Sequence, residues 1–309
     1  MIVRPGIGRD AAALAFGDQV VVAKSDPITF ATDRIGWYAV NINANDVACL
    51  GATPRFFLAT LLLPEGKATE ELVEAIFHDI AASCEALDVT LCGGHTEVTY
   101  GLDRPIVVGH MLGEVARDRL VANSRSRPGD DVLLTKGIAI EGTALIAREK
   151  ATDLRGAVDS ALLDRARGYL DAPGLSVLPD ARAVCCAALP HALHDPTEGG
   201  LATGLHELAD AAGLGIVVEA DAITVFPETQ AICHHYALDP LGLIASGSLL
   251  AVTAPGETSA VLDALAAVGI AARCIGHMVS RAEGVTLHRA GQRQLLPRFD
   301  TDEVARLFS

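Results

Sequence analysis

The chain has 309 residues, half of them hydrophobic but only 4% aromatic, and its formal net charge is −15 at pH 7. One hydrophobic core stops growing near about 250–300 residues, so we expect two domains. The acidic surface repels phosphate backbones and anionic lipid, which makes nucleic acid and membranes poor partners. Nucleotide binding remains open, because Mg²⁺ and backbone N–H groups can supply a local positive field.

The seven cysteines are odd in number and none has C-x-x-C spacing. The pattern therefore indicates neither a disulfide framework nor a zinc site. We expect most of these cysteines to be buried, reduced thiols of a cytoplasmic protein. We expect neither a signal peptide nor a membrane-spanning segment.

The first part of the chain alternates predicted strands and helices. Thr32 or Asp33 can cap the first helix, and Thr69 can cap the second, whose first turn carries two glutamates. The expected elements are a strand at 20–23, a helix at 33–50, a strand at 56–63, a helix after Thr69, and strands at 89–92 and 105–112.

A polar stretch at 123–130, rich in turn formers and without periodicity, predicts a boundary between domains 1–122 and 123–309. After it we expect strands at 131–135, 215–219 and 247–253, and one or two more before the end of the chain. Helices are expected from about 142 and at 179–189, 201–212 and 257–268. Mixed strands and helices in both halves indicate an α/β or α+β fold.

The predicted helix at 33–50 contains polar residues that a packing helix would avoid, namely Asn41, Asn43, Asn45 and Asp46. Asn and Asp compete for the backbone inside helices. The alternative is a solvated helix face, but these four residues do not share one face, so some must point inward. Buried Asn and Asp must be hydrogen-bonded or hold a metal.

Three carboxylates lie near the predicted ends of strands or helices. Asp10 follows a glycine-rich turn, Asp26 follows the first strand, and Asp46 lies in the polar helix. Each alone would be an ordinary turn or surface residue. Together they supply the oxygen ligands that Mg²⁺ prefers, so we predict that they hold a metal.

The stretch LCGGHTEVT places two glycines, a histidine and a glutamate at the end of a predicted strand. Gly93 and Gly94 allow close approach of a backbone or a ligand. His95 could ligate a metal or contact a phosphate, and Glu97 could ligate or act as a base. The residues alone fit a tight turn with a surface histidine equally well.

The second half offers a candidate anion site in HDPTEGG, ahead of a predicted helix. Thr197, Gly199 and Gly200 could present free backbone N–H groups, and Asp195 could add a carboxylate. The alternative is a simple N-cap by Thr197. Lys136, in a strand-to-helix loop, could reach a phosphate, although exposed loop lysines are commoner.

Taken in order, the motifs resemble those of the PurM-like superfamily. Its members include aminoimidazole ribonucleotide (AIR) synthetase, selenophosphate synthetase, thiamine-monophosphate kinase and the hydrogenase-maturation carbamoyl dehydratase. The stretches GIGRDAA, KSDPITF, NINANDVACLGATP and LCGGHTEVT are similar to the family's N-terminal motifs. HDPTEGGL and SGSLL resemble its hydrogenase-maturation branch, HypE.

The resemblance implies a two-domain PurM-like fold. An N-terminal domain would dimerise by forming a barrel with its partner, and a C-terminal α/β domain would follow. ATP and Mg²⁺ would be the cofactors, and ATP would phosphorylate or activate an oxygen of a small substrate. Asp10, Asp26 and Asp46 would hold metal, and His95 and Glu97 would be catalytic. The residues lining the nucleotide or substrate would be Asn43, Asn45, Gly93, Gly94, Lys136, Asp195, Thr197, Gly199 and Gly200.

The sequence also departs from the family pattern. Arg9 and His95 stand where relatives carry carboxylates, and the chain ends in Ser309 rather than the cysteine that carries the dehydratase substrate. A serine oxygen cannot replace a thiolate there. Two alternatives therefore stay open, a thiamine-phosphate kinase-like phosphotransferase and a non-catalytic nucleotide-binding assembly or maturation factor with a partner protein.

Overall fold

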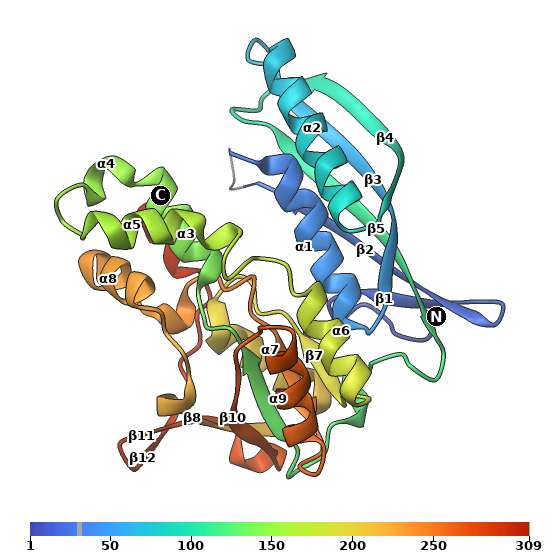
Figure 1. Cartoon of the computed structure of the whole chain (residues 1–309), viewed down its shortest axis with the longest axis vertical. Helices are drawn as coiled ribbons and strands as arrows, with labels where there is room; N and C mark the ends of the chain where they lie inside the picture. Colours follow the sequence, from blue (N-terminus) through green and yellow to red (C-terminus); the bar gives the residue numbers. More distant parts are fainter. Residues whose placement is uncertain (30–32, 309) are drawn as a thin grey trace. The chain divides into compact units, whose positions relative to one another are not determined.

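The computed structural model of the chain describes residues 1–29 and 33–308. The chain forms two compact units (Figure 1). Unit 1 comprises Met1–Pro5 and Asp10–Leu120, and unit 2 comprises Gly6–Arg9 and Val121–Ser309. Each unit combines one sheet with helices, which confirms the predicted α/β class. Within the described ranges, no helix is long and apolar enough to cross a membrane.

Unit 1 is built on a five-stranded sheet with strand order β1-β2-β5-β3-β4. Strands β3 and β4 are parallel and the other pairs are antiparallel. Helix α2 connects the two parallel strands, as a parallel crossover requires. The strands are β1 (Ala12–Phe16), β2 (Gln19–Ile28), β3 (Thr53–Pro64), β4 (Thr90–Thr99) and β5 (Ile106–Ala116).

Two helices, α1 (Ile35–Cys49) and α2 (Glu70–Ala86), pack against each other in unit 1. Thr69 caps α2 as predicted, accepting a hydrogen bond from the Leu72 amide at 3.3 Å. The N-cap of α1 is Arg34, which makes no side-chain cap. Of the two residues predicted to cap α1, Asp33 is therefore not its N-cap, and Thr32 lies outside the described residues.

Two predicted strands in unit 1 extend further than expected. Strand β2 continues through Asp26, which therefore lies within the strand and not after it. Strand β4 continues through the whole glycine-histidine motif, so the tight turn considered for that motif is wrong. Gly and Pro have a low intrinsic preference for strands. In both cases hydrogen bonds to neighbouring strands nevertheless hold the backbone extended.

Unit 2 is built on a seven-stranded sheet with strand order β12-β11-β8-β10-β6-β9-β7. Among these strands, β9 begins three residues later than predicted, because residues 246–247 form a turn. The strands are β6 (Asp131–Thr135), β7 (Ala192–His194), β8 (Gly215–Glu219), β9 (Leu250–Thr253), β10 (Ala272–Val279), β11 (Val285–Arg289) and β12 (Gln292–Leu295).

The helices of unit 2 include three that the sequence analysis did not predict, α4, α5 and α8. Their bounds are α3 (Ile140–Glu149), α4 (Ala151–Leu154), α5 (Ser160–Arg167), α6 (Leu178–Ala187), α7 (Gly200–Ala212), α8 (Pro227–Tyr236) and α9 (Thr258–Ala267). Short 3-10 turns occur at η1 (Asn123–Arg125), η2 (Gly168–Leu170), η3 (Ala220–Ala222), η4 (Pro240–Gly242), η5 (Arg281–Glu283) and η6 (Glu303–Leu307).

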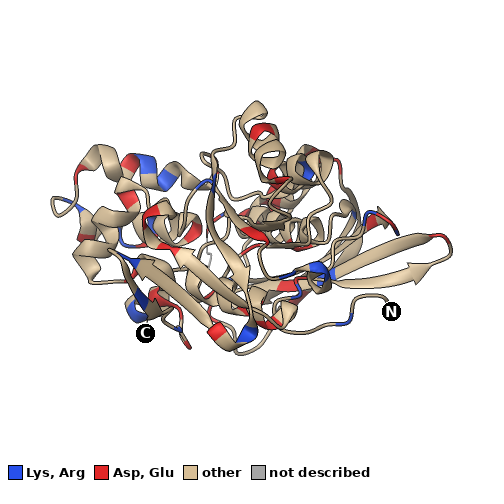
Figure 2. Ribbon diagram, turned by 90° about the horizontal axis from the view of Figure 1, so that it is seen from below, with Lys and Arg blue, Asp and Glu red and all other residues tan. Residues whose placement is uncertain are grey.

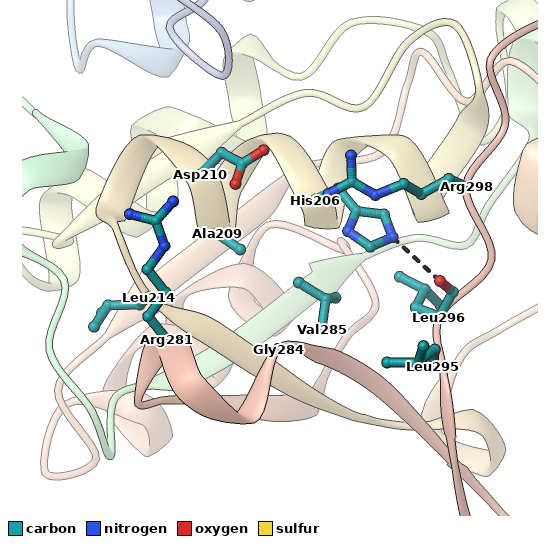
Figure 3. A pocket seen from close by; sticks show the side chains of 10 residues that line it. All are labelled: His206, Ala209, Asp210, Leu214, Arg281, Gly284, Val285, Leu295, Leu296 and Arg298. Carbon is teal, nitrogen blue, oxygen red and sulfur yellow. Dashed lines mark hydrogen bonds between the residues drawn. The ribbon is translucent and has the colours of Figure 1, made fainter.

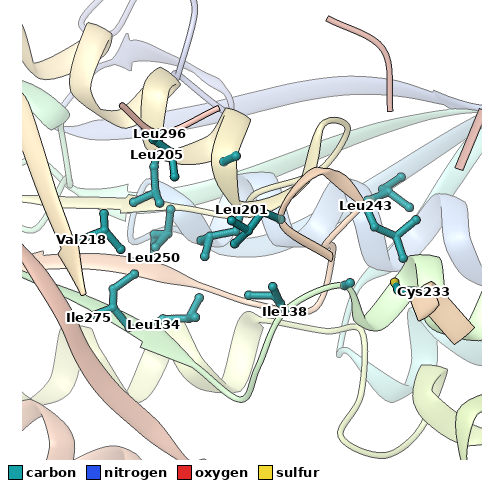
Figure 4. Packing of buried hydrophobic residues seen from close by; sticks show 14 of the residues in the cluster. Leu134, Ile138, Leu201, Leu205, Val218, Cys233, Leu243, Leu250, Ile275 and Leu296 are labelled. Carbon is teal, nitrogen blue, oxygen red and sulfur yellow. The ribbon is translucent and has the colours of Figure 1, made fainter. Parts of the chain in front are cut away.

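The core of unit 2 is aliphatic, in keeping with the low aromatic content. Leu201 and Leu205 of α7 are fully buried and lie close to side chains from four neighbouring strands (Figure 4). Burying each such leucine contributes about 1.5–3 kcal/mol. This packing fixes α7, and with it the HDPTEGG stretch that precedes it.

The cysteines differ in part from expectation. Cys49, Cys84 and Cys233 are buried, but Cys92, Cys186 and Cys274 are exposed and Cys185 is half-buried, so the prediction that most are buried is wrong. Cys92 is exposed because it lies on β4, the edge strand of its sheet. None of the seven is in a disulfide, as predicted.

Candidate functional site

All four polar residues of α1 are buried, whereas the sequence predicts only that some of them point inward. Asn43 and Asn45 are fully buried, and Asn41 and Asp46 are each only 5% exposed. The amide of Asn41 donates to the Trp37 carbonyl at 2.9 Å, one turn earlier. A helix that buries four polar side chains needs a hydrogen-bond or ionic partner for each of them.

Asp46 forms an ion pair with Lys24 of strand β2, and Lys24 in turn lies beside Asp26. Lys24 and Asp26 are two positions apart and therefore project from the same face of that strand. The Lys24 ammonium lies 3.2 Å from an Asp46 carboxylate oxygen and 3.5 Å from an Asp26 carboxylate oxygen. Two of the three predicted metal ligands therefore converge, and a lysine lies between them.

Asn43 links the helix to the same strand. Its side-chain nitrogen donates to the Ala39 carbonyl at 2.8 Å and to the Asp26 carbonyl at 3.3 Å. Its side-chain oxygen is buried and has no hydrogen-bond partner in the described chain. A Cβ at Gly109 of β5 would lie 2.3 Å from the Asn43 nitrogen, so this glycine lets the strand pass close to α1.

Asp10, the third predicted ligand, is half-buried and lies two residues before β1. Strands β1 and β2 pair with Ala12 opposite Ala23. The antiparallel register therefore leads the chain from Ala12 back toward the part of β2 that holds Lys24 and Asp26. Its role as a metal ligand stays a prediction.

The glycine-histidine motif lies across the sheet from Asp26. Asp26 pairs with Gly109, Gly109 with Ala59, and Ala59 with Gly94, so the four residues form one row across β2, β5, β3 and β4. Three strand spacings of about 4.8 Å separate the ends of that row by about 14 Å along the sheet. A single copy of unit 1 therefore does not bring the motif to the carboxylates.

Gly94 has a packing role that needs no ligand. Its φ is +152°, and a Cβ there would lie 1.8 Å from the Ala59 carbonyl oxygen. Only glycine allows β4 to approach β3 this closely. Whether Gly93 and Gly94 also admit a nucleotide stays a prediction.

His95 and Glu97 lie next to each other on one face of β4, with His95 Nε2 3.8 Å from a Glu97 carboxylate oxygen. Both side chains are more than half exposed. His95 also borders a cavity of about 200 Å³ with Phe77, Ile80 and Leu91 among its lining residues. An imidazole beside a carboxylate can exchange protons, so the pair keeps its predicted catalytic role as a hypothesis.

In unit 2, the N-terminus of α7 already contacts a carboxylate. The N-cap is Gly199, without a side-chain cap, so the alternative of a simple Thr197 cap is wrong. The Gly199 amide donates to the Asp302 carboxylate at 2.7 Å. The Thr197 carbonyl accepts from the amides of Gly200 and Ala245. The predicted anion position therefore faces an acidic side chain from the last turn of the chain.

An acidic cluster surrounds this helix start. Burial, together with the nearby charges of Glu198, Asp302 and Asp195, raises the pKa of Glu141 to about 7, against an opposing hydrogen bond with Ser246. Burial also raises the pKa of Asp302. Of these four, only Asp195 was predicted as a site residue; Glu198 lies in the same HDPTEGG stretch, whereas Glu141 and Asp302 lie far away in the chain and carry no motif. Mutual repulsion makes the cluster receptive to a cation.

Lys136 is buried, not exposed as loop lysines usually are. Its ammonium lies 3.1 Å from an Asp180 carboxylate oxygen and donates to the carbonyls of Gly174, Ser176 and Gly247 at 2.8–3.3 Å. Burial lowers the pKa of Lys136, and Asp180 opposes that shift. Four oxygens already surround the group, so its predicted contact with a phosphate would require some of them to be given up.

Comparison with known proteins defines the class. The AIR synthase related protein N-terminal domain matches residues 8–115, and the AIR synthase related protein C-terminal domain matches residues 127–288. The chain therefore belongs to the AIR synthase related protein family, in agreement with the PurM-like resemblance of its motifs.

Particular relatives agree with the hydrogenase-maturation branch. Carbamoyl dehydratase HypE of Cupriavidus necator is 32% identical over 289 residues, which is 90% of this chain and 78% of the relative. Hydrogenase maturation protein HypE in complex with ATP has a TM-score of 0.77 at 24% identity, covering 92% of this chain and 87% of the other. AaThiL complexed with AMPPCP and TMP has a TM-score of 0.75 at 18% identity, covering 94% of this chain and 90% of the other. Both structures share the fold.

Proposed function

We propose that this protein is an ATP- and Mg²⁺-dependent enzyme that activates or phosphorylates an oxygen of a small substrate. Its family membership and its similarity to a carbamoyl dehydratase support this. The fold is also shared with a HypE that binds ATP and with a ThiL that binds AMPPCP and TMP.

The observation that carries the proposal is the convergence of Lys24, Asp26 and Asp46 beside the unpartnered oxygen of Asn43. Carboxylate and amide oxygens are the donors that Mg²⁺ prefers, so these residues fit the metal. In our proposal Asp26, Asp46 and Asn43 hold it, and Lys24 moves from the carboxylates toward the phosphates. When bound, Mg²⁺ supplies neutralisation of phosphate charge during transfer.

The remaining predicted residues keep assigned roles within this proposal. Asp10 adds a carboxylate to the metal, and Asn45 supports the α1 network. Asp195, Thr197, Gly199 and Gly200 keep their predicted role of lining the nucleotide or substrate. For Gly199 to bind an anion, its amide must exchange the Asp302 carboxylate for a phosphate oxygen.

The proposal includes a homodimer formed through the sheet of unit 1. Every residue of β4 from Thr90 to Val98 is exposed, although the strand is long and carries apolar side chains. Such an edge strand invites pairing with another chain. Val98 is 56% exposed and Phe56 of β3 is 49% exposed, so a partner would cover apolar surface. Light scattering in solution tests this directly, and a monomeric mass would contradict it.

The experiment that tests nucleotide binding is calorimetric titration with ATP, with and without Mg²⁺. Wild type should bind ATP more tightly with Mg²⁺. Asp46→Ala should remove that binding, and Asp46→Asn should weaken it at least about tenfold, because the neutral amide keeps the shape but not the charge. Asp103→Ala, an exposed aspartate of the same unit, is the matched control and should bind as wild type does.

Each outcome of the titration has a meaning. Full Mg²⁺-dependent affinity in Asp46→Asn would refute the assigned metal site. No ATP binding to folded wild type would refute the nucleotide-dependent enzyme and favour an assembly factor. If binding is found, release of ADP or AMP in a substrate screen that includes thiamine monophosphate tests turnover.

A further inference from the structure

A cavity of about 370 Å³ lies in unit 2, and its lining includes none of the residues assigned above. Figure 3 shows the side chains that line it. One wall is the C-terminal half of α7, and the others are the turn before β11 and the segment that follows β12. Val285, Leu295 and Leu296 give it an apolar part. The volume falls within the range of about 300–1,000 Å³ typical of small-molecule sites.

Two arginines line this cavity from different elements. Arg281 comes from η5, and Arg298 comes from the segment after β12 (Figure 3). Within the described residues, neither guanidinium forms an ion pair or a hydrogen bond with the protein. The chain has 39 acidic and only 24 basic residues, and acidic residues are spread over many parts of the ribbon in Figure 2. Each guanidinium therefore keeps five donors available for a planar anion.

His206 adds a polar group to the lining beside Arg298 (Figure 3). Its Nε2 donates to the Leu296 carbonyl at 3.3 Å, and its Nδ1 is buried without a partner in the described chain. Burial and Arg298 lower the pKa of His206, whereas the carbonyls of Leu296 and Pro297 and the charge of Asp210 raise it. The net downward shift favours the neutral ring, in which Nδ1 can accept a hydrogen bond.

Among the described residues that line the cavity, Asp210 is the one acidic residue, and it comes from the same helix face as His206 (Figure 3). Its carboxylate repels an anion but accepts hydrogen bonds from hydroxyl groups. The lining therefore offers positive charge for an acid group, acceptors for hydroxyl groups and apolar contact for a short carbon chain.

We propose that this cavity binds a small hydroxylated organic anion, a phosphate ester or a carboxylate, held by Arg281 and Arg298. The site does not depend on the proposed ATP-dependent activity, because it shares no residue with it. A small ligand here contacts α7, η5 and the segment after β12 together, and so stabilises unit 2 on binding.

The test is calorimetric titration with two probes, glycerol 3-phosphate for phosphate esters and 3-hydroxybutyrate for carboxylates. We expect at least one probe to bind wild type with a dissociation constant below about 10 mM. Arg281→Ala and Arg298→Ala should each weaken it about tenfold or more, as the loss of a charge-assisted pair does. Arg289→Ala, an exposed arginine of β11 outside the cavity, should leave it unchanged.

Asp210→Asn gives a readout that a structural role would not produce. It removes a like charge, so the same probe should bind several-fold more tightly. The probe that binds identifies the acid group. Binding of neither probe below about 10 mM, or equal affinity in wild type and Arg298→Ala, would overturn the proposal. Circular dichroism of each variant confirms that unit 2 is folded.

Discussion

Replacement of Lys136 by Met should destabilise unit 2 severely. Lys136 and Asp180 form an ion pair at 3.1 Å in which the two side chains are 7% and 0% exposed. Met keeps the length of the side chain but leaves Asp180 as a buried charge without its partner. Breaking such a pair costs about 3–5 kcal/mol, a large share of the about 5–15 kcal/mol that stabilises a typical domain.

Three carbonyls also lose their hydrogen-bond donor in this variant. The expected loss in the free energy of unfolding therefore lies toward the upper part of the range of about 3–5 kcal/mol. Urea denaturation followed by circular dichroism measures it, with an unchanged m-value as evidence that only stability has changed. The double variant Lys136→Met with Asp180→Leu should recover several kcal/mol, because it removes the unpaired charge as well.

Lys67→Met serves as the control, because Lys67 is exposed and contacts only the Asp103 carbonyl, so its loss should cost less than about 1 kcal/mol. If the free energy of unfolding of Lys136→Met lay within about 1 kcal/mol of the wild-type value, the reasoning would be refuted. So would a double variant that is less stable than Lys136→Met alone, since the buried charge would then not be the cause.

Four further predictions concern other parts of the chain. The pKa of Glu141 is about 7 in the folded state and 4.5 as a free side chain, so the folded state binds more protons between these two pH values. Its contribution to stability therefore falls as pH rises through that window. Melting temperatures measured across this range should depend less on pH for Glu141→Gln than for wild type, and parallel curves would contradict this. Gly109→Ala should cost about 1–3 kcal/mol in thermal or urea unfolding and weaken Mg²⁺-ATP binding, because the new methyl group displaces Asn43. In calorimetry without ATP, Lys24→Met should bind Mg²⁺ more tightly than wild type, since the competing ammonium is gone. An unchanged affinity would show that Lys24 does not compete with Mg²⁺. Thr69→Ala should lower stability to urea by about 1 kcal/mol through loss of the α2 cap.

The sequence predicted the elements that local chemistry determines. The α1 helix carries four polar residues that cannot share one face, and this local argument correctly placed polar groups in the interior. The Thr69 cap followed from its own side chain and the two glutamates after it. Most helices and strands of unit 2 also follow from periodicity and turn residues, which are local signals.

Features that depend on distant parts of the chain could not be predicted. Asp302 contacts Gly199 across 103 residues, and no motif marks it. Strand β4 runs through two glycines because β3 pairs with it along its whole length, and pairing partners are not visible in a local pattern. Lys136 belongs to the same class, since the carbonyls that surround its ammonium come from two distant loops, one with Gly174 and Ser176 and one with Gly247.

The position of Lys24 has a practical consequence for ligand screening. A cation that enters between Asp26 and Asp46 must first displace an ammonium group that already neutralises them. The exchange replaces one favourable ion pair by another, so the gain in unfolding temperature is much smaller than the metal contacts alone would give. Thermal-shift screens would therefore underrate Mg²⁺ and similar ions, and direct titration is the method to choose for this protein.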